Sequence, residues 1–214
     1  MSIERDLEKM GNVPFSSDVL MSMLRDIKAP DKKLQYLEKR GDIVRLKRGM
    51  YVVNPEISRK DLCMPLIANH LYGPSYVSCQ TALRYWGLIP ERVYTVKSMT
   101  IKVAKSFENK FGRFEYIRTS EESYPIGINM VQENGASFLM AGPEKALCDL
   151  IVTTPYLNLR YKQELIDYLE DDIRLDMDEF SRLDISVLKA CAAKCKKSET
   201  INNLLKLRQN EQYI

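Results

Sequence analysis

The stretch that most constrains the fold of this chain is a short corner between two β-prone runs in residues 41–55, GDIVRLKRGMYVVNP. Residues 43–46 and 50–53 are rich in β-branched and aliphatic side chains, which is typical of strands, and a Lys-Arg-Gly corner separates them. Glycine adopts the positive φ that tight hairpin turns often require. The pattern therefore predicts a β-hairpin with Lys47 and Arg48 exposed at its tip.

Two helices are expected before this hairpin. Apolar side chains recur at helical spacing in residues 16–27, and a serine is available as the N-cap. A second helix is expected to start at Pro30 and to stop at Gly41, because proline suits the first helical position and glycine the end. Leu34 and Leu37 lie on its apolar side. Its other side carries the polar residues Lys32, Lys33, Gln35, Tyr36, Lys39 and Arg40.

A helix, a turn, a basic helix and a basic hairpin in this order outline a winged helix-turn-helix, whose second helix enters the major groove of DNA. The charge distribution supports this interpretation. The whole chain has a formal net charge of +3, whereas residues 32–48 alone hold seven basic and two acidic residues. Phosphates attract such a patch through counterion release, although a solvated basic surface is the alternative. The hairpin adds Arg45, Lys47 and Arg48 to the candidate DNA-binding residues.

Composition narrows the class of protein. The chain has 214 residues, 45% of them hydrophobic, which is enough for one large domain or two modest ones. The sequence holds no run of about 18 apolar residues, and its N-terminus, MSIERDLEKM, is charged, so we expect a cytoplasmic protein without a membrane partner. The five cysteines are odd in number and mostly have apolar neighbours, which is typical of buried reduced thiols. We expect no disulfide, no metal site and no cofactor.

A break in regular structure at Asn54-Pro55 marks the predicted domain boundary. Residues 1–55 are assigned to the winged helix-turn-helix, and residues 56–214 to a mixed α/β domain. Strand patterns in residues 93–117 and a hairpin turn at Asn134-Gly135 predict a small, mostly antiparallel sheet in this second domain. The C-terminal end is expected to be helical. The predicted fold class is therefore α+β.

A second basic segment falls within the predicted sheet, where residues 92–118 hold seven bases and two acids. Strand alternation is expected to place many of these bases on one side of the sheet. There they either extend the phosphate-contacting surface of the hairpin or are simply solvated. The candidate secondary phosphate contacts are Lys97, Lys102, Lys105, Lys110 and Arg113.

Further along the chain the sign of the charge reverses, because residues 160–184 hold nine acids and four bases. Such a face repels DNA, so we expect it to point away from DNA, towards solvent or a basic protein partner. In the helix that Pro143 is expected to open, Lys145 and Asp149 are four residues apart. We expect these two to pair as an ordinary surface couple rather than to catalyse a reaction.

No known catalytic motif is present, since the sequence holds no phosphate-binding glycine loop, no HExxH and no GxSxG. The single histidine, His70, falls near the end of a predicted helix, where capping or packing is commoner than catalysis. Cys191 and Cys195 are one helical turn apart and are too few for a structural zinc site. We therefore expect a protein that is not an enzyme and has no catalytic residues.

Three stretches of the sequence, in this order and spacing, resemble one family. The stretches are KRGMYVVNP, SYVSCQTALRYWGLIPE and GPEKALCDLI. They are similar to the AbiEi-type antitoxins, the repressor components of type IV abortive-infection toxin–antitoxin systems of bacteria. The first stretch is common to many winged helices, whereas the second and third in succession are more specific. The resemblance covers roughly residues 15–153.

This resemblance implies an N-terminal winged helix-turn-helix that binds an operator in double-stranded DNA and represses its own operon. It implies a C-terminal antitoxin domain that opposes a nucleotidyltransferase-like toxin without forming a stable complex with it. The implied DNA contacts fall on the basic helix and hairpin residues named above, and no residue is assigned to the antitoxin activity. The alternatives are a stand-alone transcription factor and a protein-interaction module that binds a basic partner through the acidic C-terminal helices.

Overall fold

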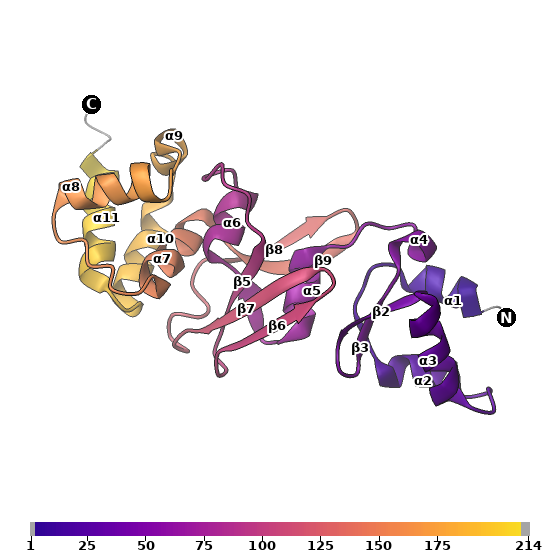
Figure 1. Cartoon of the computed structure of the whole chain (residues 1–214). Coiled ribbons are helices and arrows are strands. Elements are labelled where there is room, and N and C mark those ends of the chain that lie inside the picture. Colours follow the sequence, from indigo (N-terminus) through magenta and orange to yellow (C-terminus); the bar gives the residue numbers. More distant parts are fainter. Residues whose placement is uncertain (1–2, 211–214) are drawn as a thin grey trace.

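The structure is a computed structural model that describes residues 3–210 of the chain. Its fold class is α+β, as predicted. The molecule is elongated: a group of helices with a small sheet occupies one end, a larger sheet the middle, and C-terminal helices the other end (Figure 1).

Three helices and three short strands form the N-terminal end. Proline at the first turn opens the third helix, and Gly41, with a left-handed φ of 86°, ends it. The second helix is capped by Ser16, whose hydroxyl accepts a hydrogen bond from the Val19 amide at 3.4 Å. The two predicted helices and the hairpin are confirmed, although the first helix ends at Met23 and does not extend to residue 27. The elements are α1 (Ile3–Met10), β1 (Phe15–Ser16), α2 (Ser17–Met23), α3 (Pro30–Arg40), β2 (Ile43–Lys47) and β3 (Met50–Val53).

The β2–β3 hairpin lies between two hydrophobic cores. Strand alternation sends Ile43, Tyr51 and Val53 into the N-terminal core with α1, α2 and α3. The opposite face of the hairpin sends Val44, Leu46 and Val52 into the larger core of the rest of the chain. Burying one such side chain stabilises by about 1.5–3 kcal/mol, so this face binds the N-terminal end firmly to the second sheet. The remaining N-terminal core residues are Leu7, Phe15, Leu20, Leu24, Leu34 and Leu37.

A six-stranded mixed sheet forms the middle of the molecule, with the strand order β6-β7-β5-β4-β9-β8. The β4–β9 and β5–β7 pairs are parallel and the other pairs are antiparallel. The prediction of a mostly antiparallel sheet in this part of the chain is therefore right only in part, because three of the five strand pairs are antiparallel and two are parallel. The β5–β7 pair is parallel because β6 pairs with the outer edge of β7. The elements of this part are α5 (Met64–Leu71), β4 (Ser75–Val77), α6 (Cys79–Tyr85), β5 (Thr95–Thr100), β6 (Lys105–Asn109), β7 (Gly112–Arg118), β8 (Ile128–Glu133) and β9 (Ala136–Ala141). The short helix α4 (Pro55–Ser58) precedes them and packs against α1 at the N-terminal end.

The C-terminal end is helical, as predicted. Its first helix, α7, packs against α6, β9 and α10 and is buried on nearly every side. Helices α8 and α9 lie at the opposite end of the molecule from α3 (Figure 1). None of the described helices is both long and apolar enough to cross a bilayer. The elements are α7 (Pro143–Thr153), α8 (Lys162–Asp167), a π-helical turn η1 (Tyr168–Asp172), α9 (Met177–Phe180), α10 (Ile185–Lys194) and α11 (Ser198–Asn210).

Candidate functional site

The polar face of α3 is turned to solvent. With about 3.6 residues per turn, the predicted contact residues fall on one side of this helix, whereas Leu34 and Leu37 face the N-terminal core. Tyr36 is 51% exposed, and its ring centroid lies 4.9 Å from the Lys33 ammonium and 5.4 Å from the Arg40 guanidinium. These cation–π contacts hold the side chains together on the surface. Lys32, Gln35, Tyr36, Lys39 and Arg40 are exposed, and Lys33 is half-buried.

Both acids of the basic segment 32–48 are bound by arginines of the same segment. The Arg45 guanidinium lies 2.6 Å from the Glu38 carboxylate, and Arg40 forms an ion pair with Asp42. The hydrogen bond that Arg40 donates to Asp42 raises the pKa of Arg40, and the one that Arg45 donates to Glu38 raises the pKa of Arg45. The net positive charge of the segment therefore rests on its other cations. The cations of this segment that have no carboxylate partner among the described residues are Lys32, Lys33, Lys39, Lys47 and Arg48.

The prediction that Lys47 is exposed at the hairpin tip is wrong, whereas Arg48 is exposed as expected. A register shift in the β2–β3 pairing just before Lys47 turns this side chain towards the six-stranded sheet. Its ammonium donates a hydrogen bond to the Leu71 carbonyl at the end of α5 and lies 5.5 Å from the Phe107 ring centroid. Lys47 therefore belongs to the contact between the hairpin and the second sheet.

The six-stranded sheet divides the predicted secondary phosphate contacts between its two faces, so the expectation that alternation gathers them on one side is wrong. Lys105 pairs with Tyr116, whose hydroxyl donates to α5. Lys97 pairs with Glu115 on the opposite face, where Arg113 also lies, 2.8 Å from the Glu115 carboxylate. Successive side chains of a strand point to opposite faces of the sheet, so the basic residues of these paired strands are divided between the two faces. Lys102 lies in the β5–β6 connection and Lys110 in the β6–β7 turn.

Two of these lysines meet Lys47 around a pair of aromatic rings, and we call Lys47, Lys102, Lys105, Tyr72 and Phe107 the seam cluster. The Lys105 ammonium lies 5.0 Å from the Phe107 centroid and 5.7 Å from the Tyr72 centroid. The Lys102 ammonium lies 5.5 Å from the Tyr72 centroid. Burial lowers the pKa of Lys47, and the neighbouring charges of Lys105 and Lys102 lower it further.

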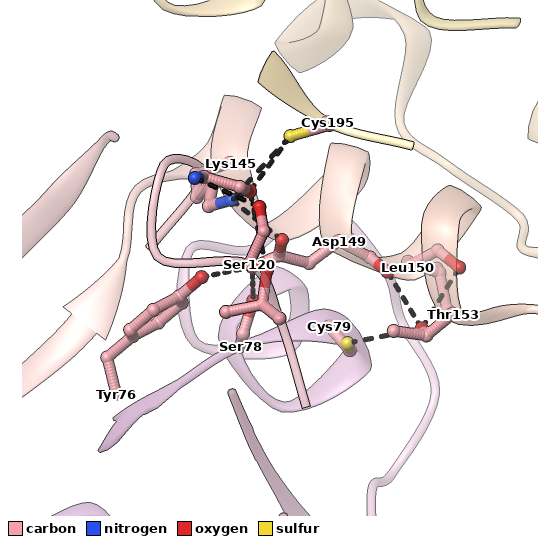
Figure 2. A network of polar contacts seen from close by, with 11 residues as sticks. Tyr76, Ser78, Cys79, Ser120, Lys145, Asp149, Leu150, Thr153 and Cys195 are labelled. Carbon is pink, nitrogen blue, oxygen red and sulfur yellow. Dashed lines mark hydrogen bonds and ion pairs between the residues drawn. The ribbon is translucent and has the colours of Figure 1, made fainter. Parts of the chain in front are cut away.

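A second polar group lies in the interior, between α7 and the start of α6 (Figure 2). The Lys145 ammonium and the Asp149 carboxylate are 2.9 Å apart, and their side chains are 0% and 2% exposed. The same carboxylate accepts hydrogen bonds from the Tyr76 hydroxyl at 3.0 Å and the Ser78 hydroxyl at 2.7 Å. Lys145 also donates to the Ser123 hydroxyl at 2.9 Å. The two residues pair as predicted, but the prediction that they form a surface couple is wrong.

The electrostatics of this buried pair follow from its enclosure. Burial lowers the pKa of Lys145, but the surrounding groups, led by the Asp149 carboxylate and followed by the Cys195 thiol, together raise it. Burial raises the pKa of Asp149, against the opposing effects of Lys145, Ser78 and Tyr76. Ser78 occupies the N-cap position of α6, yet its hydroxyl bonds to Asp149 instead of capping the helix. The arrangement fixes α7 against β4 and α6, and its charges are closed off from solvent.

One sequence signal marks this pair as buried. Lys145 and Asp149 lie within KALCDLIV, where the residues on every side of the helix are apolar, as in helices that are enclosed by other elements. All five cysteines are free thiols. Among the described residues, no group of three or more histidine, cysteine, aspartate or glutamate side chains is arranged to hold a metal ion.

Comparison of the chain with models of known protein families and with curated proteins found no match. The resemblance to the AbiEi-type antitoxins therefore stays a prediction from three stretches of sequence. The second and third of these stretches meet in the buried polar group, because Tyr76 and Ser78 come from SYVSCQ, and Lys145 and Asp149 from GPEKALCDLI.

Proposed function

We propose that the protein is a DNA-binding transcriptional regulator whose N-terminal end acts as a winged helix-turn-helix. The exposed basic face of α3 is the observation that carries this proposal. The helix has 11 residues, and no other described element covers that face. A helix of this kind fits the major groove of B-DNA, which is about 12 Å wide. Arg48, at the exposed tip of the hairpin, then contacts phosphates beside the groove.

The side chains of α3 take different roles in this arrangement. Lys32 and Lys39 are exposed one above the other on the helix and bind backbone phosphates, which set affinity and orientation without reading sequence. Gln35 lies between them, and its amide is suited to adenine, with which glutamine forms a bidentate pair in the major groove. The ion pair with Asp42 holds the Arg40 guanidinium in a fixed position at the end of the helix, where it contacts the DNA.

We extend the proposal to repression of its own operon and to an antitoxin role against a nucleotidyltransferase-like toxin, without a stable complex between the two proteins. The three resembling stretches support this extension. Two of them interlock through the buried Lys145–Asp149 pair, as expected if they form one structural unit. We assign no catalytic role to that pair, because neither side chain reaches solvent.

Binding of a basic protein partner through the acidic C-terminal segment is the second candidate function. Several acids of this segment serve the fold: Glu164 accepts from the backbone at the start of α8, and Asp176 and Asp184 cap α9 and α10. The exposed acids of this segment that form no ion pair with a described cation include one consecutive group, 170–172, in η1. It follows α8, at the end of the molecule farthest from α3 (Figure 1).

Fluorescence anisotropy with duplexes from the region upstream of the gene tests the main proposal. We expect the wild type to bind an upstream duplex more tightly than an unrelated duplex. The variant Lys32→Gln/Lys39→Gln is expected to lose about tenfold in affinity at about 100 mM salt, because two phosphate contacts disappear. The control Lys189→Gln/Lys206→Gln removes two exposed lysines from α10 and α11 and is expected to bind as the wild type does.

The proposal is rejected if the wild type binds neither duplex, or if both double variants lose affinity equally. The antitoxin extension is tested separately by co-expression with a toxin encoded beside the gene. Rescue of growth by the wild type supports it. Rescue by an unrelated DNA-binding protein at the same level, or no rescue, contradicts it. A pull-down with the variant Glu170→Gln/Asp171→Asn/Asp172→Asn tests the second candidate, which predicts loss of a basic partner that the wild type retains.

A further inference from the structure

The seam cluster brings together three lysines from different segments of the chain. Lys47 comes from β2, Lys102 from the β5–β6 connection and Lys105 from β6. They surround one aromatic pair, Tyr72 and Phe107, whose ring centroids are 6.0 Å apart. Each ammonium lies between 5.0 and 5.7 Å from a ring centroid of this pair. The N-terminal end and the six-stranded sheet thus both contribute cations to one place.

The positive charge of the seam cluster is not neutralised by the rest of the described chain. No described carboxylate forms an ion pair with any of the three ammonium groups. Lys47 donates to the Leu71 carbonyl, and Lys102 donates to the Gly73 carbonyl at 2.6 Å. These carbonyls follow the C-terminus of α5, where the helix dipole favours cations. Capping of α5 therefore explains two of the lysines.

Lys105 has no such explanation. It is exposed, and its ammonium makes ring contacts but no hydrogen bond to a described residue. Its charge adds to those of Lys47 and Lys102, and like charges at close range oppose one another. An anion at this position removes that repulsion and supplies the acceptor that the Lys105 ammonium lacks.

We propose that the seam cluster binds a phosphate group, with Lys105 as the principal contact. Phosphate suits the cluster because it carries more than one acceptor oxygen and a charge that several ammonium groups share. The phosphate comes either from the backbone of a nucleic acid or from a free phosphate or diphosphate ion. The first source rests on the proposed function, and the second does not. In both cases the bound group joins the hairpin to the second sheet.

Binding of a free ion is tested by thermal unfolding of the full chain in sodium diphosphate, compared with unfolding in sodium chloride at the same ionic strength. A ligand at about ten times its Kd is expected to raise the Tm of the wild type by about 3 °C. Lys105→Gln is expected to lose this rise. Lys189→Gln is the matched control, because Lys189 is an exposed lysine of α10, outside the cluster.

Titration of upstream duplex DNA at several salt concentrations tests the backbone source. Loss of one phosphate contact is expected to make the slope of log K against log salt shallower by about 1 in Lys105→Gln. A change in either arm that is specific to Lys105→Gln supports the site and identifies its source. If Lys105→Gln behaves as the wild type in both arms, or if Lys189→Gln loses the diphosphate response equally, the inference is overturned.

The two proposals fail in different ways. If DNA binding depends on Lys32 and Lys39 and Lys105→Gln has no effect in either arm, the proposed regulator function stands and the phosphate site is rejected. If the diphosphate response depends on Lys105 and the chain binds no DNA, the phosphate site stands and the proposed regulator function is rejected.

Discussion

Replacement of Asp149 by leucine is expected to be strongly destabilising, because it leaves the Lys145 ammonium in the interior without its carboxylate. The same change removes the acceptor of the Tyr76 and Ser78 hydroxyls, and Lys145 keeps a hydrogen bond to Ser123. Breaking a buried ion pair from one side costs about 3–5 kcal/mol, and each hydroxyl left unpaired adds roughly 1 kcal/mol or more. Since native proteins are stable by about 5–15 kcal/mol, Asp149→Leu is expected to lose much of the free energy of unfolding.

The reciprocal substitution Lys145→Met is expected to cost less. Asp149 then keeps two hydroxyl donors, and a pKa that burial raises above its ordinary 3.8 lets the carboxyl take up a proton. A group whose folded pKa lies above its unfolded value favours the folded state as the pH falls through the folded pKa. Lys145→Met is therefore expected to gain stability relative to the wild type on acidification from about pH 7 to about pH 5. The double variant Lys145→Met/Asp149→Leu, with an apolar pair, is expected to recover most of the loss.

Urea unfolding of the wild type, both single variants and the double variant measures these differences as a double-mutant cycle. The fluorescence of Trp86, the only tryptophan of the chain, is a suitable probe, because its indole N–H donates to the Ala141 carbonyl at 2.8 Å, directly before α7. A loss below about 1 kcal/mol for Asp149→Leu would refute the reasoning, since surface substitutions have effects of that size. A double variant no more stable than Asp149→Leu would refute it equally.

Two further predictions concern charges elsewhere in the chain. Lys105→Glu is expected to raise the Tm without any ligand, because it places a carboxylate beside Lys47 and Lys102 and converts repulsion into attraction; a lower Tm than that of Lys105→Gln contradicts this. Hydrogen bonds from Ser186 lower the pKa of Asp184 at the N-cap of α10. The contribution of Asp184 to stability is therefore fully present above its ordinary pKa of 3.8 and is lost as the pH falls through its pKa in the folded state. Asp184→Asn keeps a capping side chain, so urea unfolding between about pH 5 and pH 2.5 is expected to show a weaker pH dependence in the variant, and an unchanged dependence contradicts the assignment.

Local signals were sufficient to predict α3 and the β2–β3 hairpin. The helix α3 begins at Pro30 and ends before Gly41, because a proline ring and a left-handed φ affect only the helical turn next to them. Gly49, with a φ of 74°, permits the tight corner between β2 and β3. The exposed face of α3 was predictable for the same reason, since helical periodicity alone separates Leu34 and Leu37 from the polar residues.

The errors concern features that depend on distant parts of the chain. Lys47 turns inward at a register shift within the hairpin, and its side chain then contacts residues of the second core, which lie outside residues 41–55. The spacing of Lys145 and Asp149 is the same for a surface pair and a buried pair. The pair is buried because β4, α6 and α10 pack around it. The parallel β5–β7 pairing likewise depends on where β6 joins the sheet.

The most direct test of the central proposal is the salt dependence of DNA binding by the wild type and by the variant Lys32→Gln/Lys39→Gln/Arg48→Gln. Anisotropy titrations of an upstream duplex between about 50 and 200 mM salt give the slope of log K against log salt, which is about −0.9 for each phosphate contacted. If α3 and the hairpin tip lie against the duplex, the slope of the variant is shallower by about 2–3. Equal slopes for the two proteins would contradict binding through this surface.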